Sequence, residues 1–101
     1  MTTLLISRHP SAIAWVKSKV AVDKVLTHLT ENDLAKLTAD DTVIGTLPVH
    51  LAAAVCEKGT SFVYLSLDTP PELRGAELSI EQMDALGARL ESYHVERRAN
   101  L

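Results

Sequence analysis

Three short stretches of the sequence combine polar or basic side chains with glycine or proline. They are "SRHPS" (7–11), "GTLPVH" (45–50) and "LSLDTPPELRG" (65–75). Arginine can hold phosphate oxygens through paired hydrogen bonds, and histidine can take up or release a proton near neutral pH. The first two stretches also place a proline near a predicted helix start, where free backbone N–H groups and the helix dipole favour an anion. These residue types indicate an anion site, with phosphate as the expected ligand.

The residues predicted to do chemistry in these stretches are His9, Arg8 and His50. The residues predicted to bind the ligand come from the same stretches: Ser7, Ser11, Gly45, Thr46, Leu47, Pro48, Asp68 and Arg74. Structural alternatives stay open for each chemical candidate. Arg8 can simply pair with Asp68. His9 can cap a helix or lie in solvent, and His50 can be a buried hydrogen-bonded group.

The segments that must position these residues alternate between short apolar runs and helical patterns. Strands are predicted at 3–7, 24–29, 42–45 and 61–67. Two helices are predicted at 10–19 and 48–58. A short helix is predicted to follow a Thr30/Asp33 cap, and another to run from a Ser79/Gln82 capping box to about Tyr93. The tail that follows is expected to add a last strand or to pair with another subunit.

Apolar strands separated by helices are typical of βαβ units with right-handed crossovers. We therefore expect one α/β domain over residues 1–101, a small Rossmann-like fold whose mostly parallel sheet is flanked by helices. In such open sheets ligands bind beyond the carboxyl ends of the strands. The three stretches all follow predicted strands, so they are expected to meet at that edge.

Composition narrows the function classes. The net charge is −3, with 10 basic and 13 acidic residues, which argues against a protein that coats long nucleic acids. The chain has a single cysteine, no HxxxH or CxxC pattern and no glycine-rich nucleotide loop, so neither a metal nor a cofactor is expected. The first residues do not read as a signal peptide, and no apolar run approaches the roughly 18 residues of a membrane span. The expectation is a cytoplasmic protein with no membrane contact.

The strings "ISRHPSAIAWV", "DTVIGTLPVHLAAAVCEKG" and "LSLDTPPELRGAEL" resemble a small CRISPR-associated family encoded near type III systems, the sixteenth Csx family. The resemblance runs from about Thr3 to Tyr93. It implies a CARF-like domain, a symmetric homodimer and a cyclic oligoadenylate ligand, with cyclic tetra-adenylate favoured. Proteins similar to this one look like ring nucleases, which cut this signalling ring and so end the type III antiviral response.

The activity that the resemblance implies can proceed without metal. A ribose 2′-oxygen attacks the adjacent phosphorus and the 5′-oxygen leaves, so the enzyme must align the attack, stabilise charge and move protons. His9 is the first candidate for the proton-moving group and His50 the second. Arg8 and the amides around 46–49 are expected to bind phosphate, and Arg74 to close over the ring from its loop.

The remaining candidate residues receive supporting roles. Ser11 and Thr46 are expected to donate hydrogen bonds, and Asp68 to orient Arg8 or a ribose hydroxyl. Two other readings remain: a binding module that sequesters the ring without cutting it, and a structural protein that docks on the CRISPR effector.

Overall fold

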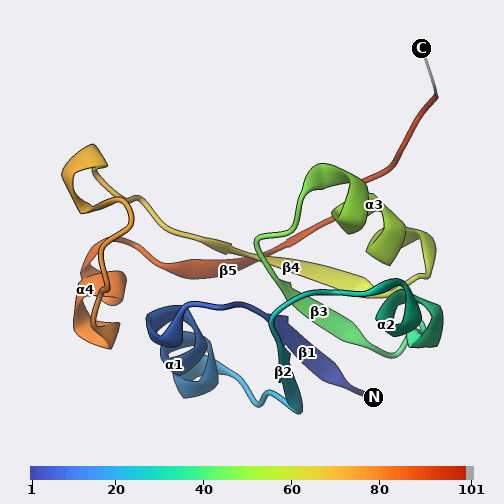
Figure 1. Cartoon of the computed structure of the whole chain (residues 1–101), viewed down its shortest axis with the longest axis horizontal. Helices are drawn as coiled ribbons and strands as arrows, with labels where there is room; N and C mark the ends of the chain where they lie inside the picture. Colours follow the sequence, from blue (N-terminus) through green and yellow to red (C-terminus); the bar gives the residue numbers. More distant parts are fainter. Residues whose placement is uncertain (100–101) are drawn as a thin grey trace.

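The computed structural model describes residues 1–99 and contains one five-stranded sheet flanked by helices (Figure 1). The strands are β1 (Thr3–Ile6), β2 (Lys24–Leu26), β3 (Thr42–Gly45), β4 (Ser61–Ser66) and β5 (Arg89–Tyr93). The helices are α1 (Pro10–Lys19), α2 (Glu31–Lys36), α3 (Val49–Glu57) and α4 (Ile80–Ala85), with a 3-10 turn at Pro71–Leu73. No helix within this described part is long and apolar enough to cross a bilayer.

The strand order is β2-β1-β3-β4-β5, and every neighbouring pair is parallel except β4 with β5. This confirms the predicted α/β class with a mostly parallel sheet. The chain moves outward from β1 to β2 on one side and from β1 to β3 and β4 on the other. The order therefore reverses between β1 and β3, which is where ligands bind in doubly wound sheets.

The two faces of the sheet are covered by different helices, and the period-2 alternation of β1 shows this directly. Leu4 and Ile6 pack in a core with residues of α2 and α3. Leu5 packs on the opposite face with Trp15 of α1 and Met83 of α4. Both faces are therefore buried, as continuous apolar strands require.

Helix starts follow the predicted caps. In α2 the Thr30 hydroxyl accepts the Asp33 N–H while the Asp33 carboxylate accepts the Thr30 N–H, and Ser79 and Gln82 form the same reciprocal pair at α4. The hydrogen bonds from Thr30 hold the pKa of the Asp33 carboxyl below its usual value. Helix α1 differs, because no side chain of its own caps it and its first turn holds no acidic residue.

The prediction that the last helix continues to about Tyr93 is wrong for its second half. Helix α4 ends at Ala85, and Gly87 then takes a φ of +76°, which turns the chain back along β4 as the antiparallel strand β5. The last strand was expected in the tail after about Tyr93, but it is formed earlier, by residues Arg89–Tyr93. The predicted strand at 24–29 is also shorter than expected, since β2 ends at Leu26.

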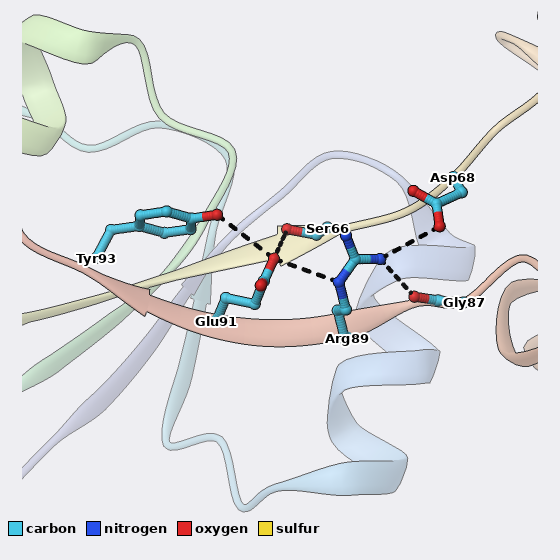
Figure 2. A network of polar contacts seen from close by, with 6 residues as sticks. All are labelled: Ser66, Asp68, Gly87, Arg89, Glu91 and Tyr93. Atoms are coloured by element: carbon cyan, nitrogen blue, oxygen red, sulfur yellow. Dashed lines mark hydrogen bonds and ion pairs between the residues drawn. The ribbon is translucent and has the colours of Figure 1, made fainter.

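A polar network fastens β5 to the end of β4 (Figure 2). The Ser66 hydroxyl donates to Glu91 Oε1 at 2.5 Å, and Arg89 Nε lies 3.4 Å from the same oxygen. Arg89 Nη1 donates to the Gly87 carbonyl at 2.9 Å and lies 3.6 Å from Asp68 Oδ2. Ser66 is 8% exposed, so this hydroxyl gains its partner inside the protein. The network holds the turn at Gly87 and the carboxyl end of β4 in place.

Candidate functional site

A cleft of ≈ 510 Å³ lies at the carboxyl ends of β1, β3 and β4, on the sheet face covered by α1 and α4. Its other walls are the start of α1 and the segment 69–78 that precedes α4. The floor is apolar and includes Leu5, Leu65, Leu67, Leu78 and Met83. The rim is polar and includes Ser7, His9, Ser11, Thr46, Arg74 and Glu77. A concave apolar pocket with a few convergent polar groups is the usual form of a small-molecule site.

The cleft unites residues from all three stretches that the sequence singled out. Of the predicted site residues, those that line it are Ser7, His9, Ser11, Gly45, Thr46 and Arg74. The parallel register explains part of this meeting, because Ile6 pairs with Gly45 and their successors leave the sheet side by side. The expectation that these stretches meet at one edge of the sheet agrees with this geometry.

The other predicted site residues lie outside the cleft lining. Arg8 is exposed between two lining residues, Leu47 packs against the core on the α3 side, and Pro48 caps α3. His50 lines a separate hollow of ≈ 380 Å³ between α3 and the chain after β5. The two histidines therefore do not share a cavity.

Asp68 also differs from its predicted position. Its carboxylate lies beside Arg89 just past the end of β4 (Figure 2), so its ion-pair partner is Arg89 and not Arg8. Sequence reasoning had no means to foresee this pair, because Arg89 was expected inside a helix.

Gly45 forms part of the cleft wall and is paired with Ile6 at the carboxyl ends of β1 and β3. A Cβ added to Gly45 would lie 2.8 Å from the Ile6 carbonyl oxygen and 3.3 Å from Ile6 Cβ. The lack of a side chain thus permits the two central strands to stay paired at their carboxyl ends. This close approach is between strands, so it does not depend on a ligand.

The start of α1 forms one rim of the cleft and is held by two side-chain hydrogen bonds. The His9 N–H donates to Ser7 Oγ at 3.2 Å, which bends the chain between β1 and the helix. The Ser11 hydroxyl donates to Glu77 Oε2 at 2.6 Å. Glu77 belongs to the segment before α4, so a carboxylate from 66 residues further along the chain lies at the positive end of α1.

Glu77 is the cleft residue that sequence reasoning missed. It was visible only as part of the string "RGAEL", and nothing in its spacing indicated that it would reach Ser11. The side chains with ionisable groups that line the cleft are His9, Arg74 and Glu77. Within residues 1–99 no ion pair involves any of these three, so their charges face the cleft and its solvent.

Over the described range no three side chains of the histidine, cysteine, aspartate or glutamate type are grouped so that they could hold a metal ion. The polar rim therefore presents hydroxyls, one guanidinium, one imidazole and one carboxylate as its reactive groups.

No match is found among curated proteins or among solved structures. The model of one protein family, described as "Putative CRISPR-associated protein (Cas_VVA1548)", matches residues 4–96. That range covers the whole cleft and all the described strands and helices except Thr3, the first residue of β1. The chain thus belongs to this family of CRISPR-associated proteins.

Proposed function

We propose that this protein is a ring nuclease that binds and cuts cyclic oligoadenylate, with cyclic tetra-adenylate as its substrate, and thereby ends type III CRISPR signalling. The observation that carries the proposal is the cleft, where His9, Ser11, Thr46 and Arg74 surround an apolar floor at the reversal point of the sheet. Membership of a CRISPR-associated family and the resemblance to the sixteenth Csx family support the choice of ligand.

The cleft suits an adenosine phosphodiester in size and in the distribution of polar groups. Its volume falls within the range of roughly 300–1,000 Å³ usual for small-molecule sites. The apolar floor offers a surface for adenine, and Arg74 and the hydroxyls of Ser11 and Thr46 offer donors to phosphate oxygens. A protein of net charge −3 can bind such an anion because the positive groups are local.

The proposed reaction uses the ring's own ribose as nucleophile. The 2′-oxygen attacks the neighbouring phosphorus, the bond to the 5′-oxygen breaks, and a linear fragment with a 2′,3′-cyclic phosphate results. Binding in the cleft would align the attack, and the guanidinium and hydroxyl donors would stabilise the extra negative charge of the transition state. No metal takes part in this scheme.

The ring is larger than one adenosine, and we propose that two copies of the chain hold it as a symmetric homodimer. A two-fold axis repeats one cleft twice, which suits a ligand built from identical units. Each copy would then contribute its own His9 and Arg74 to one half of the ring.

The test is cleavage of radiolabelled cyclic tetra-adenylate in EDTA, with enzyme at a tenth of the substrate concentration. The proposal expects complete conversion to linear product, which requires turnover. Capture of ring equal to the protein sites, without product, would instead identify a sequestering module. No binding at all would favour a structural role on the CRISPR effector. A His9→Ala variant, run in parallel, is expected to bind the ring and cut it slowly.

A further inference from the structure

Cleavage by a 2′-oxygen requires two proton transfers, one from the attacking hydroxyl and one to the leaving 5′-oxygen. Three side chains with ionisable groups line the cleft, and the guanidinium of Arg74 is a hydrogen-bond donor without an acceptor atom. The other two are His9 and Glu77. We propose that Glu77 is the general base of the reaction and that His9 is its general acid; this assignment rests on the proposed ring nuclease function.

The hydrogen bond from Ser11 fits Glu77 for the role of base. The Ser11 hydroxyl donates to Glu77 Oε2 at 2.6 Å, so the carboxyl group acts as an acceptor there. The same bond fixes the position of the carboxyl group beside the first turn of α1, at the rim of the cleft. Among residues 1–99, Oε1 of the same group accepts no hydrogen bond, so it can receive the 2′-hydroxyl proton.

The Ser11 bond also places the carboxylate. Within the described chain, it is the one hydrogen bond that joins residues 69–77 to the rest of the protein, since the other bonds of that segment are internal. This bond holds the segment beside the start of α1, where the Glu77 side chain lines the cleft. Arg74 of the same segment also lines the cleft, so a phosphate bound by Arg74 would lie in the cavity that Glu77 faces.

His9 fits the role of acid. It is the residue just before α1, its backbone is held by Ser7, and its exposed imidazole lines the cleft. An exposed imidazole can be reprotonated by water between turnovers. His50 cannot share this task within one subunit, because it lines the hollow behind α3.

Glu77 Oε1 removes the 2′-hydroxyl proton while the 2′-oxygen forms a bond to phosphorus. The bond from phosphorus to the 5′-oxygen breaks, and protonated His9 gives its proton to that oxygen. Neutral His9 and protonated Glu77 then exchange protons with water, and no oxidant, reductant or metal is consumed.

The experiment compares two substrates and four proteins. The proteins are wild type, Glu77→Gln, His9→Ala and Glu72→Gln; the last removes the same charge from the same loop at a residue that does not line the cleft. The glutamine of Glu77→Gln keeps an oxygen that can accept the Ser11 hydroxyl, so the segment stays in place. One substrate is cyclic tetra-adenylate, and the other has sulfur in place of each bridging 5′-oxygen. A thiolate leaves without a proton, so the second substrate needs the base but not the acid.

With the oxygen substrate, we expect Glu77→Gln and His9→Ala each to lose about 10²–10⁴-fold in single-turnover rate, the range for general acid–base catalysis. Glu72→Gln should match wild type, and all four proteins should bind the ring. With the sulfur substrate, His9→Ala should approach the wild-type rate while Glu77→Gln stays slow.

Several results would overturn the assignment. These are an unchanged rate for Glu77→Gln, loss of ring binding by that variant, rescue of Glu77→Gln by sulfur, or no rescue of His9→Ala. If wild type itself leaves the oxygen substrate intact, the proposed function fails and the base assignment fails with it. The wild-type reaction therefore distinguishes failure of the proposed function from failure of the acid and base assignment alone.

Discussion

Gly45→Ala should destabilise the folded protein, because residue 45 lies where β1 and β3 pair beside the cleft. The new methyl group would lie 2.8 Å from the Ile6 carbonyl oxygen, closer than a carbon atom can approach it without repulsion. That oxygen belongs to the backbone of a central strand, so no side-chain rotation can relieve the contact. Residue 45 has no positive φ, so the change adds no backbone strain of its own. Overpacking of this kind costs about 1–3 kcal/mol, partly offset by about 0.4–1 kcal/mol from the stiffer unfolded chain.

The middle of each range, about 2 and about 0.7 kcal/mol, leaves a net loss of about 1.3 kcal/mol. This corresponds to a fall in melting temperature of about 5–10 °C for a domain of this size. Urea unfolding followed by Trp15 fluorescence and by circular dichroism would measure it, with Thr46→Ala as the matched control. Thr46 is the next residue in the same wall and is exposed, so its truncation should stay within about 0.5 kcal/mol of wild type. A Gly45→Ala protein as stable as wild type would refute the argument that a methyl group at residue 45 meets the Ile6 carbonyl oxygen.

Three further predictions concern charged groups. The hydrogen bond from Trp15 Nε1 and the nearby Lys19 hold the pKa of the Asp84 carboxyl below its usual 3.8. Its stabilising effect is therefore complete above that pH and lost as pH falls through the lower folded pKa, so thermal melts between pH 6 and pH 2 should decline less for Asp84→Asn than for wild type. Arg8→Ala should weaken ring binding in a titration while the far-ultraviolet spectrum stays unchanged, and equal affinity would remove Arg8 from the site. His50→Ala should cut cyclic tetra-adenylate at the wild-type rate, and a loss comparable to that of His9→Ala would show that His50 takes part.

Local signals predicted the bounds of three of the first four strands and three of the helices well, and the reasons are physical. Helix α1 has the predicted bounds because a proline starts it and β-branched residues follow it. Strand β3 also has its predicted bounds, since "TVIG" lies between a pair of aspartates and a loop. The capping boxes at Thr30 and Ser79 depend on residues three apart, and such signals are complete in the sequence itself.

The end of α4 shows where local reasoning stops. Met83, Leu86 and Leu90 have the spacing of one helix face. The same Leu90 also fits a strand, in which Leu90 and Ser92 lie on one face and Arg89 lies on the other. Gly87 could end a helix or lie within one, and its neighbours do not decide between these alternatives. The decision comes from the exposed edge of β4, whose backbone groups need partners that only a fifth strand supplies.

The edge of the sheet that holds the candidate site could be predicted, because it follows from the parallel arrangement of the strands. The rule that ligands bind beyond strand ends correctly brings Ser7, Gly45 and Thr46 to one edge. It does not say on which face of the sheet each side chain lies, and this is why His50 was grouped with His9. Helix α3 packs on the face opposite α1, so the first turns of the two helices lie on different sides of the sheet.

The single antiparallel strand explains how the far end of the sequence reaches the cleft. In each parallel connection the chain must return to the other end of the sheet, so its helix runs away from the ligand edge. Strand β5 instead begins at the edge where β4 ends, so the whole connection 67–88 stays there, at the left of Figure 1 beside α1. Arg74 and Glu77 lie in that connection, and Glu77 contacts Ser11 across the cleft. The polar network of Figure 2 therefore supports the site although none of its side chains lines the cleft, because it fixes the strand pairing that keeps this segment at the ligand edge.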